Sequence, residues 1–274
     1  MRRRVVPAVV ATVLCSVCAG AGAQDASTDR PPEDRWTFVV APYLWAISLD
    51  GDAEVKGVET DVDVPFSDAV KDLSFGGMLL VDARRGRFGI AANGVFTRVS
   101  PDEEVGPIEI DATSDLAQLG VGPYYRAIAW QYGETAAGQP LRLIVEPWVG
   151  ARLNHLRLEL ELNRQGRFQD VDLGRVGQHF DDSETWVDPI VGTRFALNLT
   201  ERWIVAGEAD VGGVLAGSDL SWNVQGYLGY RTSVLGQPTT FAIGYRVLHV
   251  DYDHNDFKWD VTQQGPILGA VLRF

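Results

Sequence analysis

The feature that most restricts the fold of this chain is an alternation of apolar and polar side chains that recurs in segment after segment. Within residues 202–213, Trp203 and Val205 share one face, whereas Glu208 and Asp210 share the other. Side chains of a β-strand point alternately to its two faces, so a period of two indicates extended chain. The same alternation is found in residues 141–153, 185–198 and 219–233. The sequence therefore predicts an all-β protein.

Segments of strand length follow one another from residue 36 to the carboxyl end. They are 36–49, 73–83, 88–98, 110–126, 141–160, 185–198, 202–213, 219–233, 239–252 and 257–274. A barrel with both chain ends on the same side has an even number of strands, so we predict an antiparallel up-and-down transmembrane β-barrel of about 10 strands, within a range of about 8–12. The count is about ten if 59–64 belongs to an extracellular loop, and about twelve if 59–64 and part of 163–183 enter the wall.

The sign of the alternation separates a membrane barrel from a water-soluble one. A membrane barrel turns its apolar faces to lipid and its polar faces to the lumen, and a soluble barrel does the reverse. Aromatic residues near the strand ends favour the membrane barrel, because such residues gather at membrane–water interfaces, although core packing is the alternative explanation. These aromatics are Trp36, Trp45, Trp130, Tyr132, Trp186, Trp203 and Trp259.

The amino end has the pattern of a secretory signal peptide. The basic residues of Met1–Arg4 precede a short apolar run and an Ala-x-Ala site that ends at Ala23, so we predict a signal peptide at 1–23. A periplasmic lead at 24–35 and a barrel domain at 36–274 would follow it. The formal net charge of −13 argues against a nucleic-acid partner.

Prolines occur inside several predicted strands. Pro147, Pro189 and Pro266 are each followed three residues later by glycine, and by the alternation all three prolines face the apolar side. A proline removes one hydrogen-bond donor from the sheet, so we interpret the repeat as a bulge or bend of the wall. Unrelated prolines between shorter strands are the alternative interpretation.

The carboxyl end, Gly265–Phe274, is an alternating segment that stops on an aromatic residue. It resembles the closing strand of Gram-negative outer-membrane β-barrels, with matches at Gly269, Leu272 and Phe274 and a departure at Ile267. The resemblance implies that these residues form the assembly signal that the barrel-assembly machinery reads.

The chain from about residue 36 to residue 274 resembles the small outer-membrane β-barrel proteins, among them the OmpA-like and OmpW-like barrels. The resemblance is found in Pro42–Trp45, Gly244–Leu248 and Gly265–Phe274. It implies location in the cell outer membrane, with outer-membrane lipid and lipopolysaccharide as partners, and it brings no catalytic motif.

Charged side chains of both signs lie on the predicted inner face of the barrel. They are Asp82, Arg142, Glu146, Arg152, Asp188, Arg194, Glu208, Asp210, Arg231 and Arg246. Buried charges must be paired, and the lumen of a narrow barrel can be filled by side chains. We therefore predict a structural or surface-interaction barrel with a charge-paired, largely filled lumen. The alternatives are a narrow pore for small solutes or ions and a lipid-modifying enzyme.

The enzyme hypothesis depends on the histidine-rich run His249–Asp256 and on the hydroxyls of Ser183 and Ser218. No spacing among these residues matches a catalytic signature. We therefore expect no enzyme, no catalytic or metal-binding residues and no cofactor. The acidic loops, which include Asp50, Asp52 and residues 59–63, could approach lipopolysaccharide phosphates through divalent cations.

Overall fold

The computed structural model describes residues 35–55, 58–65, 73–99, 102–105, 108–164, 179–254 and 257–274. The predicted signal peptide at 1–23 and all of the predicted lead except Arg35 lie outside these residues. Within the described ranges the regular structure consists of strands, and no helix there is long and apolar enough to cross a membrane.

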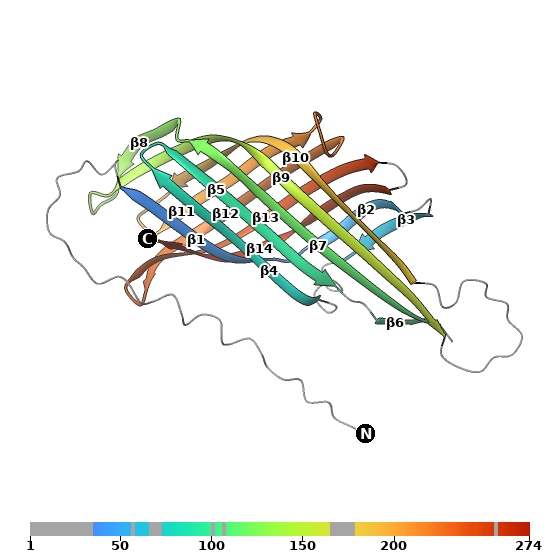
Figure 1. Ribbon diagram of the computed structural model, residues 1–274. Coiled ribbons are helices and arrows are strands. Elements are labelled where there is room, and N and C mark those ends of the chain that lie inside the picture. The colour runs from blue at the N-terminus through green and yellow to red at the C-terminus, as the bar shows by residue number, and fades with distance from the viewer. Residues whose placement is uncertain are drawn as a thin grey trace, which may run out of the picture.

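The strands are long for a protein of this size, and Figure 1 shows how they curve around a common axis. In chain order they are β1 (Trp36–Trp45), β2 (Ser48–Val55), β3 (Val58–Val64), β4 (Leu73–Arg85), β5 (Phe88–Val99), β6 (Asp102–Val105), β7 (Ile108–Tyr125), β8 (Ile128–Glu134), β9 (Pro140–Arg164), β10 (His179–Asn198), β11 (Trp203–Gly213), β12 (Leu220–Val234), β13 (Gln237–His254) and β14 (Phe257–Arg273).

The strands close into a 10-strand antiparallel barrel, as the sequence predicted. The wall runs from β1 through β4, β5, β7 and β9–β14, and β14 returns to pair with both β1 and β2. β2 continues β1 after a bend at Ala46 and Ile47, so the two together make one wall strand. β3, which holds the predicted loop segment 59–64, pairs with β2 alone among the described strands, and the count of ten follows from this.

The carboxyl-terminal residue takes part in the closure of the barrel. The backbone N–H of Phe274 donates to the carbonyl of Phe38 at 2.9 Å, and the N–H of Phe38 donates back at 3.0 Å. Short turns between β4 and β5, β10 and β11, and β12 and β13 lie at this same end, which we call the turn end (Figure 1). The opposite end, which holds the connection from β13 to β14, is called the loop end.

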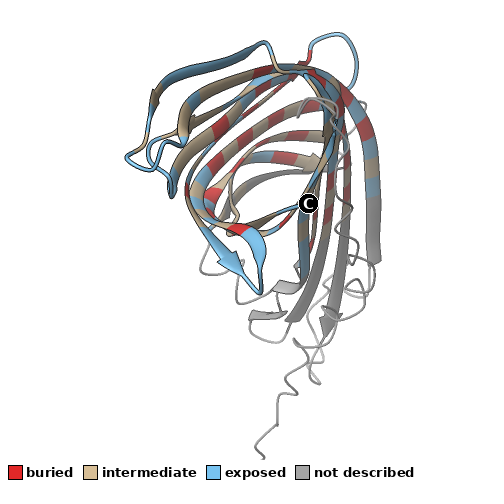
Figure 2. Ribbon diagram, turned by 90° about the vertical axis from the view of Figure 1, so that its left-hand side faces the viewer, coloured by how far each residue is buried: buried red, intermediate tan, exposed pale blue. Residues whose placement is uncertain are grey.

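The apolar face of the wall points outward in the half of the barrel nearer the turn end. Phe195 and Trp203 are each 42% exposed, while Asp188 and Asn154 on the inner face are buried. Figure 2 shows buried residues at alternate positions along the strands, as a period of two requires. In this half of the barrel, the apolar face therefore points outward and the polar face inward, as predicted.

Aromatic side chains form a belt on the outer surface at the turn end. Its rings lie in neighbouring pairs, with centroids 4.9 Å apart for Phe88–Tyr125 and 5.0 Å apart for Trp203–Tyr230. The predicted outward positions of Trp36, Trp130, Tyr132 and Trp203 are confirmed. The prediction was wrong for Trp45, Trp186 and Trp259, which are buried inside the barrel.

The reason for this error is that the two faces exchange polarity part of the way along each of several strands. In β13, Phe241, Ile243 and Tyr245 point outward and are exposed. Beyond Val247, the apolar residues of β13 point inward and the polar ones outward. Leu248 and Val250 are buried, and the outward positions between and after them are His249, Asp251 and Asp253.

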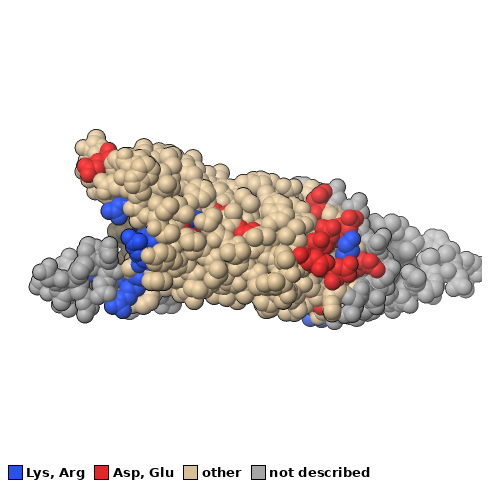
Figure 3. All heavy atoms as spheres, turned by 90° about the horizontal axis from the view of Figure 1, so that it is seen from above, with Lys and Arg blue, Asp and Glu red and all other residues tan. Residues whose placement is uncertain are grey.

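The same exchange occurs in β14 and gives the molecule two ends of different charge. Leu268 is exposed on the outside, whereas Val261 and Trp259 are buried on the inside and Asp260 and Lys258 take the outward positions. Figure 3 shows the result on one face. Basic residues gather at the turn end, acidic residues gather at the loop end, and the band between them carries few charges.

The predicted bulges at the Pro-x-x-Gly repeats are not present. The register runs without a shift through Pro189↔Ala151, Thr193↔Pro147 and Tyr245↔Pro266. The three prolines face outward, as expected. Each proline lies at a gap in the pairing with the strand on its other side, and at Pro266 this gap faces the bend at Ala46 and Ile47, so the bend half of the interpretation holds there.

Candidate functional site in the lumen

The interior of the barrel contains two layers of side chains that differ in chemistry. The first, called the polar layer, lies at the height of the outer apolar band. The second, called the apolar plug, fills the half of the lumen nearer the loop end. The plug consists of Trp45, Ala53, Val95, Leu116, Leu156, Trp186, Leu248, Val250, Tyr252, Phe257, Trp259, Val261 and Ile267.

Arg194 is the centre of the first part of the polar layer. Its Nη2 lies 3.1 Å from Asp82 Oδ2 and 2.8 Å from Glu146 Oε2. Arg194 belongs to β10 and Asp82 to β4, so this ion pair crosses the lumen between strands that are not neighbours. Arg126 Nε donates to the other oxygen of Glu146 at 2.8 Å, and the Tyr124 hydroxyl donates to Asp82 at 2.9 Å.

The second part of the polar layer joins β9, β11, β12 and β13. Arg152 Nη2 lies 2.5 Å from Asp210 Oδ1, and the side chains of both are almost fully buried. The amide of Asn223 donates to Asp210 Oδ2 at 2.8 Å and accepts from Arg246 Nε at 2.8 Å. The guanidinium of Arg246 lies 4.4 Å above the ring of Trp45, where the polar layer meets the apolar plug.

Asp188 anchors Ser218, near the end of the connection between β11 and β12, inside the barrel. The Ser218 backbone N–H donates to Asp188 Oδ1 at 2.7 Å, and the Ser218 hydroxyl donates to Oδ2 at 3.0 Å. The indole N–H of Trp186 donates to the same hydroxyl at 2.9 Å, and Asn154 also donates to Asp188. A side chain at Gly217 would collide with Asp188, so this connection requires glycine there. Ser218, a candidate nucleophile in the sequence, thus uses its hydroxyl to fix the loop.

A small cavity lies within the polar layer. Its volume is about 40 Å³, and its lining includes Gln118, Trp148, Arg152, Glu208 and Arg246. Among the described residues, Arg152 Nη1, Arg246 Nη1, Trp148 Nε1 and Gln118 Oε1 are buried polar atoms without a protein partner. A polar space of this size holds a few water molecules.

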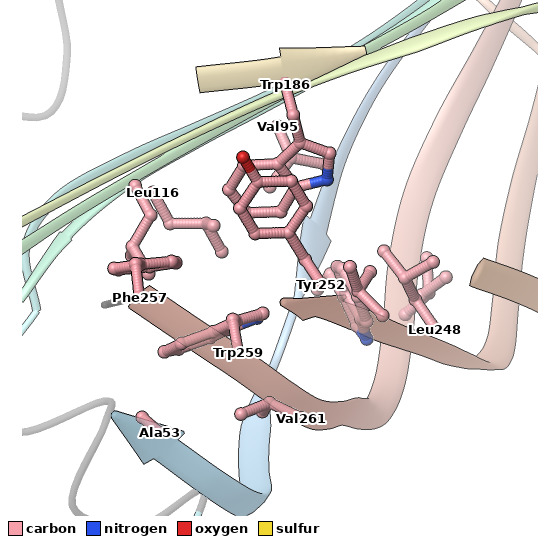
Figure 4. Close-up of a cluster of buried hydrophobic side chains, with 13 residues drawn as sticks. Ala53, Val95, Leu116, Trp186, Leu248, Tyr252, Phe257, Trp259 and Val261 are labelled. Carbon is pink, nitrogen blue, oxygen red and sulfur yellow. The ribbon is translucent and has the colours of Figure 1, made fainter. Parts of the chain in front are cut away.

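The apolar plug is built around stacked aromatic rings, which Figure 4 shows at close range. Trp186 from β10 stacks on Tyr252 from β13 with centroids 4.2 Å apart and planes 12° from parallel. Phe257 from β14 contacts both rings. Leu156, Leu248 and Val261 are at most 1% exposed. These side chains come from strands on different sides of the wall and pack together inside the barrel.

The structure brings most of the predicted lumen charges together. Asp82, Glu146, Arg152, Asp188, Arg194, Glu208, Asp210 and Arg246 all lie in the polar layer. Arg231 lies apart at the turn end, where it donates to Asn198. Arg142 is exposed on the β8–β9 hairpin, which extends beyond the closed wall. Gly269 of the predicted assembly signal faces the lumen beside Tyr43, and Phe274 lies on the outer surface.

Within the described part of the histidine-rich run, His249, Asp251 and Asp253 lie on the outer surface near the loop end. His249 Nε2 is 3.8 Å from Asp260 Oδ1, and its Nδ1 is 3.2 Å from Thr262 Oγ1. Burial, with further contributions from Asp260 and Asp219, raises the pKa of Asp251. On β7, a hydrogen bond from Arg98 lowers the pKa of Asp115. The described residues contain no group of three or more His, Cys, Asp or Glu side chains placed to hold a metal ion.

The fold and the lumen together define the class of protein. A closed antiparallel up-and-down barrel of ten strands, with an apolar outer band, an aromatic belt and paired charges inside, has the architecture of the small outer-membrane β-barrel proteins.

Comparison with known proteins gives only distant similarities. No protein-family model and no curated protein sequence match the chain. Among solved structures, the attachment invasion locus protein Ail of Yersinia pestis is 14% identical, with a TM-score of 0.36, over 88% of this chain and 99% of that one. A FadL homologue of Pseudomonas aeruginosa is 8% identical, with a TM-score of 0.27, over 87% and 89%. The toluene transporter TodX of Pseudomonas putida is 9% identical, with a TM-score of 0.22, over 89% and 90%. Function must therefore be argued from the lumen and the surface of the protein itself.

Proposed function

We propose that the protein is an outer-membrane barrel with a closed lumen, and that its role is structural or lies in surface interaction at the loop end. In this proposal the turn end lies in the periplasm and the loop end projects from the cell. The barrel-assembly machinery would insert it, with Gly269, Leu272 and Phe274 as the signal. Outer-membrane lipid and lipopolysaccharide would surround the apolar band.

The observation that carries the proposal is that two unlike layers of side chains, the polar layer and the apolar plug, follow one another inside the barrel. An ion crossing the polar layer would have to break the Arg194–Asp82 pair, which bridges the non-adjacent strands β10 and β4, and the Arg194–Glu146 pair between the neighbouring strands β10 and β9. It would then meet the stacked rings of Trp186 and Tyr252, which carry no charge to replace its hydration. A pore function would require both layers to rearrange.

The exchange of polarity along the strands supports the membrane location. In β13 the outward apolar positions run from Phe241 to Val247, and the whole stretch from Gln237 to Val247 has roughly the 9–11 residues that a tilted membrane strand needs. Beyond it, the barrel is apolar inside and acidic outside, as suits a part of the protein that projects into water. The outward aspartates there would meet lipopolysaccharide phosphates through divalent cations.

Recordings on planar bilayers test the closed lumen directly. We expect the refolded full chain, with its insertion verified by protease protection, to give no steady conductance steps. The matched variant Leu215→Ala, in an exposed loop, should behave in the same way. Large, stable steps from the unmodified protein would favour the narrow-pore alternative. For the surface role, lipopolysaccharide binding that does not respond to added magnesium would contradict the bridging by cations.

A further inference from the structure

Two arginines of the polar layer, Arg152 and Arg246, border the same small cavity although they come from β9 and β13, which are not neighbours in the wall. Both residues are buried, with 4% and 5% of their surface exposed. In each of them the terminal nitrogen Nη1 has no protein partner among the described residues. Trp148 Nε1, a further N–H group of the lining, is also buried without such a partner. Three side chains that border the cavity therefore have buried N–H groups that are still able to donate hydrogen bonds.

A chain of hydrogen bonds fixes where the two guanidinium groups lie. Arg152 Nη2 lies 2.5 Å from Asp210 Oδ1. Asn223 joins Asp210 to Arg246, because its amide donates to Asp210 Oδ2 and accepts from Arg246 Nε, both at 2.8 Å. Asp210 and Asn223 are themselves a cross-strand pair of β11 and β12. The two positive groups are thus held at one cavity by a chain that contains a single carboxylate.

The charges around the cavity favour an anion inside it. Among the described residues that line it, the charged ones are three arginines and one acid, namely Arg152, Arg194, Arg246 and Glu208. The carboxylates that pair with Arg152 and Arg194 do not belong to the lining, and Arg246 forms no ion pair with a described carboxylate. Like charges that are kept close together away from water repel one another strongly. A small anion that contacts the guanidinium groups would offset this repulsion and accept from the unpartnered N–H groups.

The size of the cavity limits which anion it can hold. Its volume of about 40 Å³ accommodates a halide ion, which is only slightly larger than a water molecule. An organic anion such as gluconate is too large to enter. The site therefore discriminates between anions of the same charge by size.

We propose that the cavity binds one chloride ion, which accepts hydrogen bonds from Arg152 Nη1, Arg246 Nη1 and Trp148 Nε1. The remaining space takes a water molecule that donates to Gln118 Oε1, the unpartnered acceptor of the lining. The ion is captured as the barrel closes and stabilises the polar layer of the folded chain. This inference goes beyond the proposed function, and it does not depend on which end of the barrel lies in the periplasm.

Glu208 is the one charged group of the lining that opposes an anion. It lies on the same face of β11 as Asp210, and its carboxyl group forms no hydrogen bond with another described side chain. A carboxylate at this position would repel chloride, whereas a carboxamide would not. Glu208→Gln should therefore bind chloride more tightly than the unmodified protein.

The dependence of stability on the anion tests the site in vesicles. The full chain is refolded and then unfolded with urea in sodium gluconate, in which chloride replaces gluconate stepwise at constant ionic strength. Chloride that binds only the folded chain raises the urea midpoint, and at ten times its dissociation constant the rise should be about 0.7 M. Trp148→Phe removes one donor and should weaken chloride binding about tenfold, which reduces the rise at the same concentration to about 0.2 M. The matched control Trp130→Phe, at an exposed position, should keep the full rise.

Crystals of the full chain grown in sodium bromide locate the ion directly. We expect an anomalous bromide peak within hydrogen-bond distance of Arg152 Nη1, Arg246 Nη1 and Trp148 Nε1. Bromide peaks at exposed arginines alone would overturn the proposal, as would equal urea midpoints in chloride and gluconate. An equal chloride-dependent rise in Trp148→Phe and Trp130→Phe would place the ion elsewhere and overturn it too. A chloride response seen only in Glu208→Gln would show that the unmodified cavity holds water alone.

Discussion

Removing one partner of the Arg152–Asp210 pair should destabilise the barrel far more than removing both. In Arg152→Met, the Asp210 carboxylate stays buried and retains the amide of Asn223 as its remaining described donor. Breaking a buried pair in this way costs about 3–5 kcal/mol. In the double variant Arg152→Met with Asp210→Leu, no buried charge is left uncompensated. We therefore expect the double variant to recover at least half of that loss.

Reversible urea unfolding in lipid vesicles, followed by tryptophan fluorescence, measures these differences. With a slope of about 2 kcal/mol per molar urea, a loss of about 4 kcal/mol lowers the midpoint by about 2 M. Ala151→Met is the matched control, because it adds the same side chain at the neighbouring outward position, and it should change stability by about 0.5 kcal/mol or less. A midpoint of Arg152→Met close to that of the unmodified protein would refute the assignment of a desolvated ion pair.

Two further predictions concern the ends of the chain and of the barrel. Asp188→Ala removes the two hydrogen bonds that Ser218 donates to Asp188, so limited proteolysis should cut near Leu215 at least about tenfold faster. An unchanged cutting rate would argue that these hydrogen bonds do not hold the loop. Deleting Phe274 removes two backbone hydrogen bonds to Phe38, so gel-shift assays of folding should show slower closure of the barrel. The control variant Phe274→Tyr keeps both hydrogen bonds and should fold normally. Equal folding rates for the unmodified protein, the deletion and Phe274→Tyr would contradict a role of Phe274 in closure.

The wall of the barrel could be predicted from the sequence because it depends on a local pattern. The alternation of Trp203 and Val205 with Glu208 and Asp210 requires only that each strand separates two environments. Gly86 and Gly236 take the positive φ in the turns at Arg85–Phe88 and Val234–Gln237, although in the second turn Leu235 also has a positive φ. These features are encoded within a few neighbouring residues, and the ten-strand closure follows from them.

The apolar plug could not be predicted in the same way, because alternation does not say which environment each face meets at each height. Trp186 and Trp259 were assigned to the aromatic belt from their places near strand ends. The relevant signal was the change of phase in β13, where Tyr245 and Leu248 are apolar on opposite faces. Such a change indicates the level at which the surroundings of the wall turn from lipid to water.

Other parts of the site depended on contacts between distant segments. Ser218 reaches Asp188 across 30 residues, and nothing near Ser218 in the sequence indicates that its side chain is buried inside the barrel. Arg142 has the alternation of a lumen residue, but β9 begins beyond the closed wall, so its side chain lies outside the polar layer. The positions along the barrel axis at which strands begin and end depend on how the strands pair, and a sequence pattern predicts these positions poorly.

The central claim is that the membrane boundary lies where β13 exchanges its faces, at Val247. Single nitroxide labels placed along β13 from Phe241 to Asp253 in vesicles, with collisions measured against oxygen and a water-soluble nickel complex, test it most directly. Outward positions up to Val247 should favour oxygen, His249, Asp251 and Asp253 should favour nickel, and Leu248 and Val250 should be shielded from both. Oxygen contact that continues at the outward positions to Asp253, or lipid contact at Leu248 and Val250, would contradict the account.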